Sequence, residues 1–185
     1  VFAAEAQARK PGAHRMVVFG DAADGSREQS AIARAVAAVR PDAVFITGDL
    51  VYGRGRAAEY RARFYPVYNG EATPLMRRVP FLGVVGNHDV PFPGFPDASA
   101  YFAYWSQPLN GPALSPGDRS AAPLKAGVHV AVAAAAGPAF PRMASFSFDY
   151  GRAHWTVLDS NGYADWDSPS LNAWLEADLR AARGA

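Results

Sequence analysis

The chain has 185 residues, enough for one domain with a substantial core, and its 18 basic and 17 acidic residues leave a net charge of only +1. Such a balance provides no field that would attract nucleic acid or an anionic membrane, and no apolar stretch approaches the roughly 20 residues of a membrane span. Cysteine is absent, so disulfides and thiolate metal sites are excluded, and any metal must be held by oxygen and nitrogen atoms.

The first half of the chain alternates strand-like and helix-like segments. Apolar runs bounded by turn-forming residues predict buried strands at 15–19, 43–47 and 80–85. Ser26 and Gln29 resemble a capping box, and helical spacing of apolar residues continues to about residue 39. A second helix is expected at 57–68, where Pro66 ends or kinks it. This order predicts an α/β fold with a parallel sheet and both helices on one face.

The second half begins with a long stretch from 90 to 124 that is rich in Pro, Gly and Ser. A loop of that length is usually functional, and its aromatic cluster YFAYW is expected to pack in the core or in a lid. Strand-like patterns follow at 128–135, 143–151 and 153–161, and the last two are joined by a turn at Gly151-Arg152. The segment 168–182 predicts an amphipathic helix, capped by Ser168 or Ser170.

Polar residues follow the apolar run of each of the first three strands. These strand ends read Gly20-Asp21, Gly48-Asp49 and Gly86-Asn87-His88-Asp89. Because ligands of parallel sheets bind outside the carboxyl ends of the strands, we expect Asp21, Asp49 and Asn87 to converge on one patch. Converging carboxylates repel unless a cation lies between them, so the pattern indicates a hard metal ion. A phenolate from Tyr52 would add a donor that suits a trivalent ion such as iron.

The blocks GDAADG, GDLVY and GNHD, in this order on successive strands, resemble those of the calcineurin-like metallophosphoesterases. Many members of that family carry a histidine two residues after the first aspartate, where this chain has Ala23. The purple acid phosphatases also lack this histidine, and they place a tyrosine three residues after the second aspartate, as Tyr52 is placed here. The chain is therefore similar to the purple acid phosphatase-like branch, although Ala23 stands where that branch has glycine.

The resemblance implies a metallophosphoesterase domain over 1–185 with an α/β/β/α sandwich. It implies a phosphatase or phosphodiesterase that uses a dinuclear metal centre, iron with zinc, manganese or iron, and a metal-bound hydroxide as nucleophile on a phosphate ester. In such a centre, Asp21 and Tyr52 would bind the first metal. Asp49 would bridge the two metals and Asn87 would bind the second. His88 would lie beside the metals as the catalytic residue, contacting the phosphate or protonating the leaving oxygen.

Further histidines that the family carries downstream are absent from this sequence. Its other histidines, His14, His129 and His154, lie in contexts that favour structural or surface roles. We therefore expect this sequence to be the N-terminal portion of the domain, with the missing ligands supplied by a downstream segment or a second chain. The alternative is a non-catalytic truncated remnant that acts as a binding or structural module.

Three further features of the sequence carry weaker interpretations. Asp24 and Asp89 are expected to support the metal ligands or to form turns and caps. Asp159 and Asn161 also end a strand, and we expect them on an outer part of the sheet. The opening VFAAEAQA resembles the tail of a removed targeting segment, which slightly favours a periplasmic or secreted location without fixing it.

Overall fold

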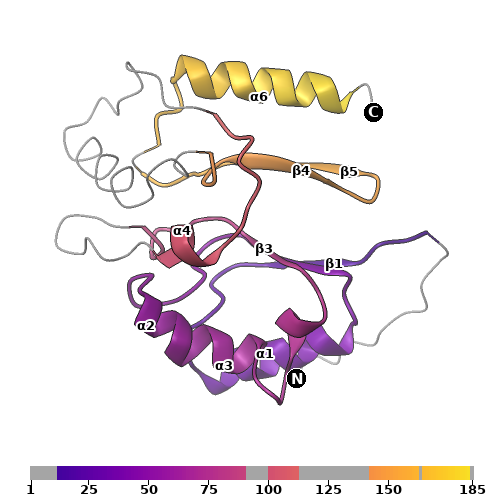
Figure 1. Ribbon diagram of the computed structural model, residues 1–185, viewed down its shortest axis with the longest axis vertical. Helices are drawn as coiled ribbons and strands as arrows, with labels where there is room; N and C mark the ends of the chain where they lie inside the picture. Colours follow the sequence, from indigo (N-terminus) through magenta and orange to yellow (C-terminus); the bar gives the residue numbers. More distant parts are fainter. Residues whose placement is uncertain (1–11, 91–99, 113–141, 163, 184–185) are drawn as a thin grey trace.

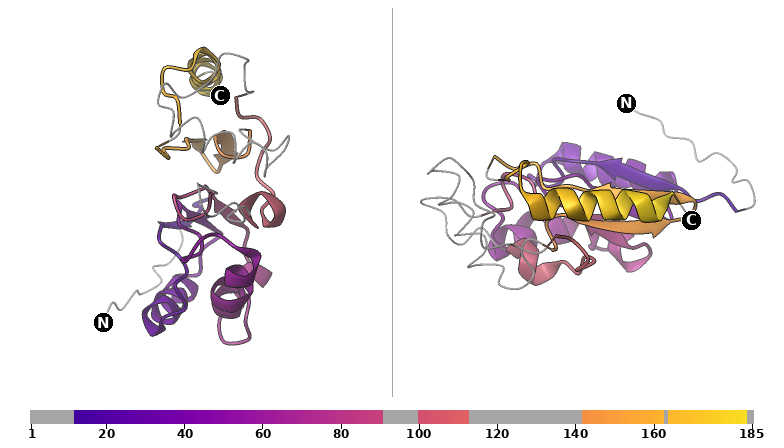
Figure 2. Two further views of the ribbon diagram at one scale, coloured as in Figure 1. Left: turned by 90° about the vertical axis from the view of Figure 1, so that its left-hand side faces the viewer. Right: turned by 90° about the horizontal axis from the view of Figure 1, so that it is seen from above.

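The computed structural model describes residues 12–90, 100–112, 142–162 and 164–183. These residues form four layers: a group of helices, a three-stranded sheet, a two-stranded sheet and a long outer helix (Figures 1 and 2). The predicted α/β/β/α architecture is confirmed for this part of the chain. No helix within the described ranges is both long enough and apolar enough to cross a membrane.

The first sheet consists of three parallel strands in the order β1-β2-β3. The strands are β1 (Met16–Phe19), β2 (Ala43–Ile46) and β3 (Phe81–Gly83), and each lies within a predicted strand. Pairing continues just beyond β2, because the Thr47 amide donates to the Phe19 carbonyl at 2.9 Å. All of β2 is buried, as its continuous apolar run predicts for a central strand covered on both faces.

Helix α1 (Arg27–Ala38) begins at the predicted cap. The Ser26 hydroxyl accepts a hydrogen bond from the Gln29 amide at 3.0 Å. The Gln29 side chain does not return to Ser26, because it accepts from the Gly25 amide at 2.7 Å. The Ser26 amide instead donates a hydrogen bond to the Asp24 carboxylate at 2.8 Å. Of the two roles expected for Asp24, the structure therefore shows the turn-forming one.

The predicted helix at 57–68 is present and contains a π-helical segment. It consists of α2 (Ala57–Glu59), the π-helix η1 (Tyr60–Phe64) and α3 (Tyr65–Tyr68). Pro66 has no amide hydrogen and its ring would clash with the carbonyl one turn earlier in a regular helix. The wider π turn, in which the Tyr65 amide donates to the Tyr60 carbonyl, lets the chain pass this proline without ending the helix. A short 3₁₀ helix, η2 (Leu75–Arg77), precedes β3.

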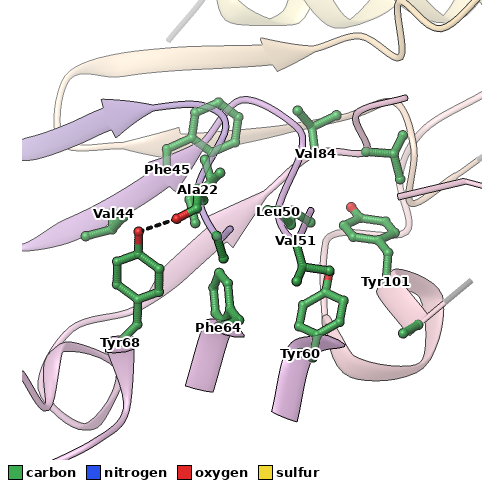
Figure 3. Close-up of a cluster of buried hydrophobic side chains, with 14 of the residues drawn as sticks. Ala22, Val44, Phe45, Leu50, Val51, Tyr60, Phe64, Tyr68, Val84 and Tyr101 are labelled. Carbon is green, nitrogen blue, oxygen red and sulfur yellow. Dashed lines mark hydrogen bonds between the residues drawn. The ribbon is translucent and has the colours of Figure 1, made fainter. Parts of the chain in front are cut away.

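Aromatic side chains fill the space between this helical layer and the first sheet. Tyr60, Phe64 and Tyr68 are almost completely buried and point toward the sheet and its loops (Figure 3). The Tyr68 hydroxyl donates to the Ala22 carbonyl at 2.7 Å, so the core also fixes the loop after β1 (Figure 3). From α4 (Ala100–Tyr104), the buried Tyr101 donates to the Gly83 carbonyl at 3.1 Å. This part of the aromatic cluster thus packs in the core, as expected.

The second sheet is the antiparallel hairpin of β4 (Phe146–Tyr150) and β5 (Ala153–Val157), joined by the predicted turn. It stacks on the first sheet through aromatic rings, because Phe45 lies 6.0 Å from Phe148 and 6.1 Å from Trp155 between ring centroids. Helix α6 (Pro169–Ala182) covers the outer side of the hairpin, and Ser168 is its cap. The strand predicted at 128–135 lies outside the described residues.

Candidate functional site

A cleft of about 380 Å³ lies where the carboxyl ends of strands from both sheets meet. Its lining comes from the segments that follow β1, β2, β3 and β5. The lining residues are Asp21, Thr47, Gly48, Asp49, Val85, Gly86, Asn87, Ser160, Asn161 and Gly162. The predicted convergence of Asp21, Asp49 and Asn87 is therefore confirmed.

The two aspartates occupy a backbone conformation that residues with a Cβ atom rarely adopt. Asp21 has φ +55° and Asp49 has φ +50°, both in the left-handed region. Neighbouring amides stabilise this arrangement, because the Asp21 amide donates to the Gly48 carbonyl at 3.1 Å and the Ala22 amide to the Asp49 carbonyl at 2.8 Å. Strained conformations of this kind cluster at functional sites. The loops after β1 and β2 thus hold two carboxylates side by side at a conformational cost.

The loop after β3 closes tightly on Asp49. A Cβ atom at Gly86 would lie 2.1 Å from both the amide nitrogen and the Oδ1 atom of Asp49, so no other residue fits there. The His88 amide donates to Asp49 Oδ1 at 3.0 Å. Asp49 is consequently fixed by groups from the neighbouring strand end.

Tyr52 lies against the first carboxylate. Its hydroxyl donates a hydrogen bond to Asp21 Oδ1. This bond, followed by partial burial and the negative charges of Asp21 and Asp49, raises the pKa of the Tyr52 phenol well above its usual range. The phenol is therefore neutral beside the two carboxylates, and a cation bound between these oxygens would favour the phenolate instead.

His88 packs beside Tyr52 at the edge of the site. The two ring centroids are 4.8 Å apart. The Nδ1 atom of His88 lies 3.1 Å from the Gly53 carbonyl, and because a carbonyl only accepts, Nδ1 carries the hydrogen in this bond. Nε2 is then the nitrogen that can exchange a proton. His88 does not line the cleft itself, so its catalytic role stays a prediction.

Asp89 connects two loops of the site through hydrogen bonds. It is completely buried and accepts hydrogen bonds from the amides of Leu50 and Gly86, each at 2.9 Å, and of Val51 at 3.3 Å. Burial raises the pKa of the Asp89 carboxyl to about 7, against the opposing effect of these amides. Asp89 therefore joins the segment that carries Asp49 to the segment that carries Asn87, which is the supporting role expected for it.

Asn161 is a cleft residue whose position the sequence interpretation got wrong. Asp159 and Asn161 were expected on an outer part of the sheet, but Asn161 lines the same cleft as the aspartates. The reason is that the hairpin stacks on the first sheet, which brings the end of β5 above the end of β3. The signal was present in the sequence, because Asp159 and Asn161 follow an apolar strand just as Asp21 and Asp49 do.

The donors that the site offers are all oxygen atoms. Asp21, Asp49, Tyr52 and Asn87 supply carboxylate, phenol and amide oxygens, the chemistry that hard cations prefer. Within the described ranges, no group of three or more His, Cys, Asp or Glu side chains is placed to hold a metal ion. Of the other histidines, His14 packs against Tyr150 of the hairpin, His154 lies within β5 and bonds Asp149 and Asp178, and His129 is outside the described residues.

Comparison with known proteins agrees with this site. A family model described as calcineurin-like phosphoesterase matches residues 14–182. A search of curated proteins and a search of solved structures each found no match. The family match therefore spans all four layers of the structure and every residue predicted for the site.

Proposed function

The chain belongs to the calcineurin-like phosphoesterase family, and we propose that it is a metal-dependent hydrolase of phosphate esters. Members of this family generally bind two metal ions. The single observation that carries the proposal is the cleft in which Asp21 and Asp49, both in left-handed conformations, meet Asn87. Two carboxylates held together in this way concentrate negative charge that a cation would neutralise.

Each residue has a distinct part in the proposed site. Asp21 and Tyr52 would hold the first ion, Asp49 would bridge, and Asn87 would hold the second. Bound ions of this kind neutralise phosphoryl oxygens and lower the pKa of a water molecule. With Nδ1 fixed by the Gly53 carbonyl, His88 would use Nε2 to contact the phosphate or to give a proton to the leaving oxygen.

Within the family, we propose the purple acid phosphatase-like branch with iron at the first position and zinc, manganese or iron at the second. Two observations support this assignment. The Tyr52 hydroxyl lies at Asp21, where a phenolate would meet the first ion. Ala23, which stands where many members have histidine, is fully buried. Imidazole donors for the second ion would come from outside the described residues, from a downstream segment or a second chain.

Metal binding tests the proposal most directly. We expect the purified chain to hold one Mn²⁺ ion loosely and Asp49→Asn to lose that binding, whereas Asp167→Asn, at an exposed position near α6, should bind as the wild type does. If the wild type and Asp49→Asn bind Mn²⁺ equally, the proposal is wrong.

Turnover of 4-nitrophenyl phosphate separates the enzyme from its alternative. Where turnover is measurable, His88→Ala should lower it by about 100-fold or more, as for loss of a general acid, while Mn²⁺ binding is unchanged. Binding without turnover, even after the proposed imidazole donors are supplied, would instead support the non-catalytic binding module.

A further inference from the structure

The side chain of Asn161 is held in one orientation at the wall of the cleft. Asn161 is only 9% exposed. Its amide nitrogen Nδ2 donates to Asp159 Oδ1 at 2.8 Å and lies 3.5 Å from the Gly86 carbonyl. Both of these partners are acceptors, so the nitrogen end of the carboxamide must face them. Within the described part of the chain, the oxygen Oδ1 has no hydrogen-bond donor.

Asn161 and Asp49 lie against the same glycine. The Gly86 carbonyl faces Asn161 Nδ2, and the Cα of Gly86 is so close to Asp49 that an added Cβ atom would overlap Asp49 Oδ1. Asn161 and Asp49 also line the same cleft, together with Asp21 and Asn87. An amide oxygen for which the described residues supply no donor is thus part of the lining that holds the two carboxylates.

We propose that Asn161 Oδ1 is a further ligand of the cation, contributed by the second sheet. This inference rests on the proposed function, because it concerns the same metal site. Because Oδ1 receives no donor from the described residues and is not a fully buried atom, a cation in the cleft can reach it, and amide oxygens are ordinary ligands of hard cations. Asn161 would add a ligand to a site that is short of donors. It would also make the cation a bridge between the two sheets.

The test measures Mn²⁺ affinity by isothermal titration calorimetry and the shift of the melting temperature on adding Mn²⁺. Asn161→Ala removes the oxygen and should weaken Mn²⁺ binding by about tenfold or more, with a smaller shift of the melting temperature. Asn161→Asp keeps an oxygen but sets a second carboxylate against Asp159. Without metal, this variant should have a lower melting temperature than the wild type. It should nevertheless bind Mn²⁺ at least as tightly, and its melting temperature should rise more when Mn²⁺ is added.

Asn110→Ala is the matched control. Asn110 bonds both the amide and the carbonyl of Ser147, so its loss should lower the melting temperature of the same hairpin. Because Asn110 does not line the cleft, Mn²⁺ affinity should be unchanged. Circular dichroism establishes that each variant is folded. If Asn161→Ala does not fold, the Mn²⁺ affinity of Asn161→Asp is the test. An affinity of Asn161→Asp below that of the wild type overturns the inference.

The outcomes distinguish this inference from the proposed function. If Asp49→Asn loses Mn²⁺ binding but Asn161→Ala binds like the wild type, Asn161 only supports the fold, and the inference alone is wrong. If the wild type does not bind Mn²⁺, the proposed function and the inference both fail. Weaker binding in Asn161→Ala together with retained binding in Asn161→Asp is the result expected for a ligand.

Discussion

The two helical layers are attached to their sheets by different means. Beneath the first sheet, the helix at 57–68 inserts fully buried rings, among them Tyr60 and Phe64. Above the second sheet, α6 has no buried residue, and Leu179 on its apolar side is 45% exposed. The attachment of α6 centres instead on one carboxylate, Asp178. The comparison shows that one domain can combine a layer held by apolar packing with a layer held by a polar network.

Asp178 makes three hydrogen bonds to the hairpin. It accepts from the Ser147 hydroxyl at 2.5 Å and from the Thr156 hydroxyl and His154 Nε2, each at 2.9 Å. His154 Nδ1 bonds Asp149 at 2.8 Å. Because both ring nitrogens of His154 face carboxylates, the doubly protonated imidazolium is the form that satisfies all of these bonds. The strength of this network depends on the protonation of His154 and Asp178, whereas the packing of the rings beneath the first sheet does not depend on protonation.

Phe64→Ala should have the largest effect on stability. Phe64 is completely buried and its ring centroid lies 4.9 Å from that of Tyr68 and 5.8 Å from that of Trp105. The cavity left by alanine should lower the free energy of unfolding by about 3–5 kcal/mol, as measured by urea denaturation. Leu179→Ala is the control on α6 and should cost far less. Equal losses in the two variants would contradict the comparison.

Asp178→Ala should come next. It leaves Ser147, Thr156 and His154 without their shared acceptor, and unsatisfied groups of this kind cost about 1–3 kcal/mol. Amide hydrogen exchange of Asp178→Ala should show that α6 opens faster than the helix at 57–68. Glu176→Ala, an exposed acidic change on the same helix, serves as the reference. An unchanged exchange rate in α6 would mean that its apolar side, and not Asp178, holds it in place.

The third effect is a dependence on pH. The hydrogen bonds to Asp178 and then to Asp149 raise the pKa of His154 above its ordinary value of 6.5. Burial opposes the change at Asp178, but bonds from Ser147, His154 and Thr156 lower the pKa of that carboxyl below 3.8. The contribution of His154 is therefore complete below pH 6.5 and is lost as the pH rises through its raised pKa. That of Asp178 is complete above pH 3.8 and is lost as the pH falls through its lowered pKa.

Urea denaturation of the wild type and of His154→Gln across this range measures the effect. The difference in stability between the two proteins should shrink as the pH rises above 6.5. The raised pKa of Asp89 also makes stability fall as the pH rises. Because both proteins contain Asp89, its contribution cancels in the difference between their stabilities. A difference that is independent of pH would show that His154 is not charged in the folded protein.

The smallest effect belongs to the ion pair within α6. Arg180 and Glu176 form a pair one turn apart, and both side chains are largely exposed. Pairs of this kind are worth about 0.3–0.5 kcal/mol, and salt screens them. Arg180→Gln should accordingly lower stability by no more than this, and the loss should vanish in 1 M NaCl. A larger loss would indicate that Arg180 has a role in docking α6.

Much of the fold was predictable because its signals are local. Buried runs such as 43–46 and the cap at Ser26 depend on neighbouring residues, so the sequence predicts them well. The π-helical segment was not predicted, because the wider turn is a response to Pro66 within a helix that the core keeps in place. The sequence marks the proline, but the packing of Tyr60 and Phe64 decides whether the helix ends or widens.

In the candidate site, too, the sequence predicts the positions of some residues and not of others. Parallel topology is enough to bring Asp21, Asp49 and Asn87 to one cleft, and that prediction is confirmed. Asn161 was misplaced because its position depends on how the hairpin stacks on the first sheet, which no local pattern specifies. The roles of Tyr52 and His88 stay predictions, since they concern bound ions and substrate.

The aromatic contact between the sheets also bears on how fast the chain reaches its native state. Phe45 meets Phe148 and Trp155 across more than half of the length of the sequence, whereas the paired strands within each sheet are separated by much shorter stretches of chain. Contacts between distant segments close large loops and slow folding. The docking of the two sheets should therefore be a late event, so that loosening the Phe45–Trp155 contact would mainly accelerate unfolding and leave the refolding rate almost unchanged.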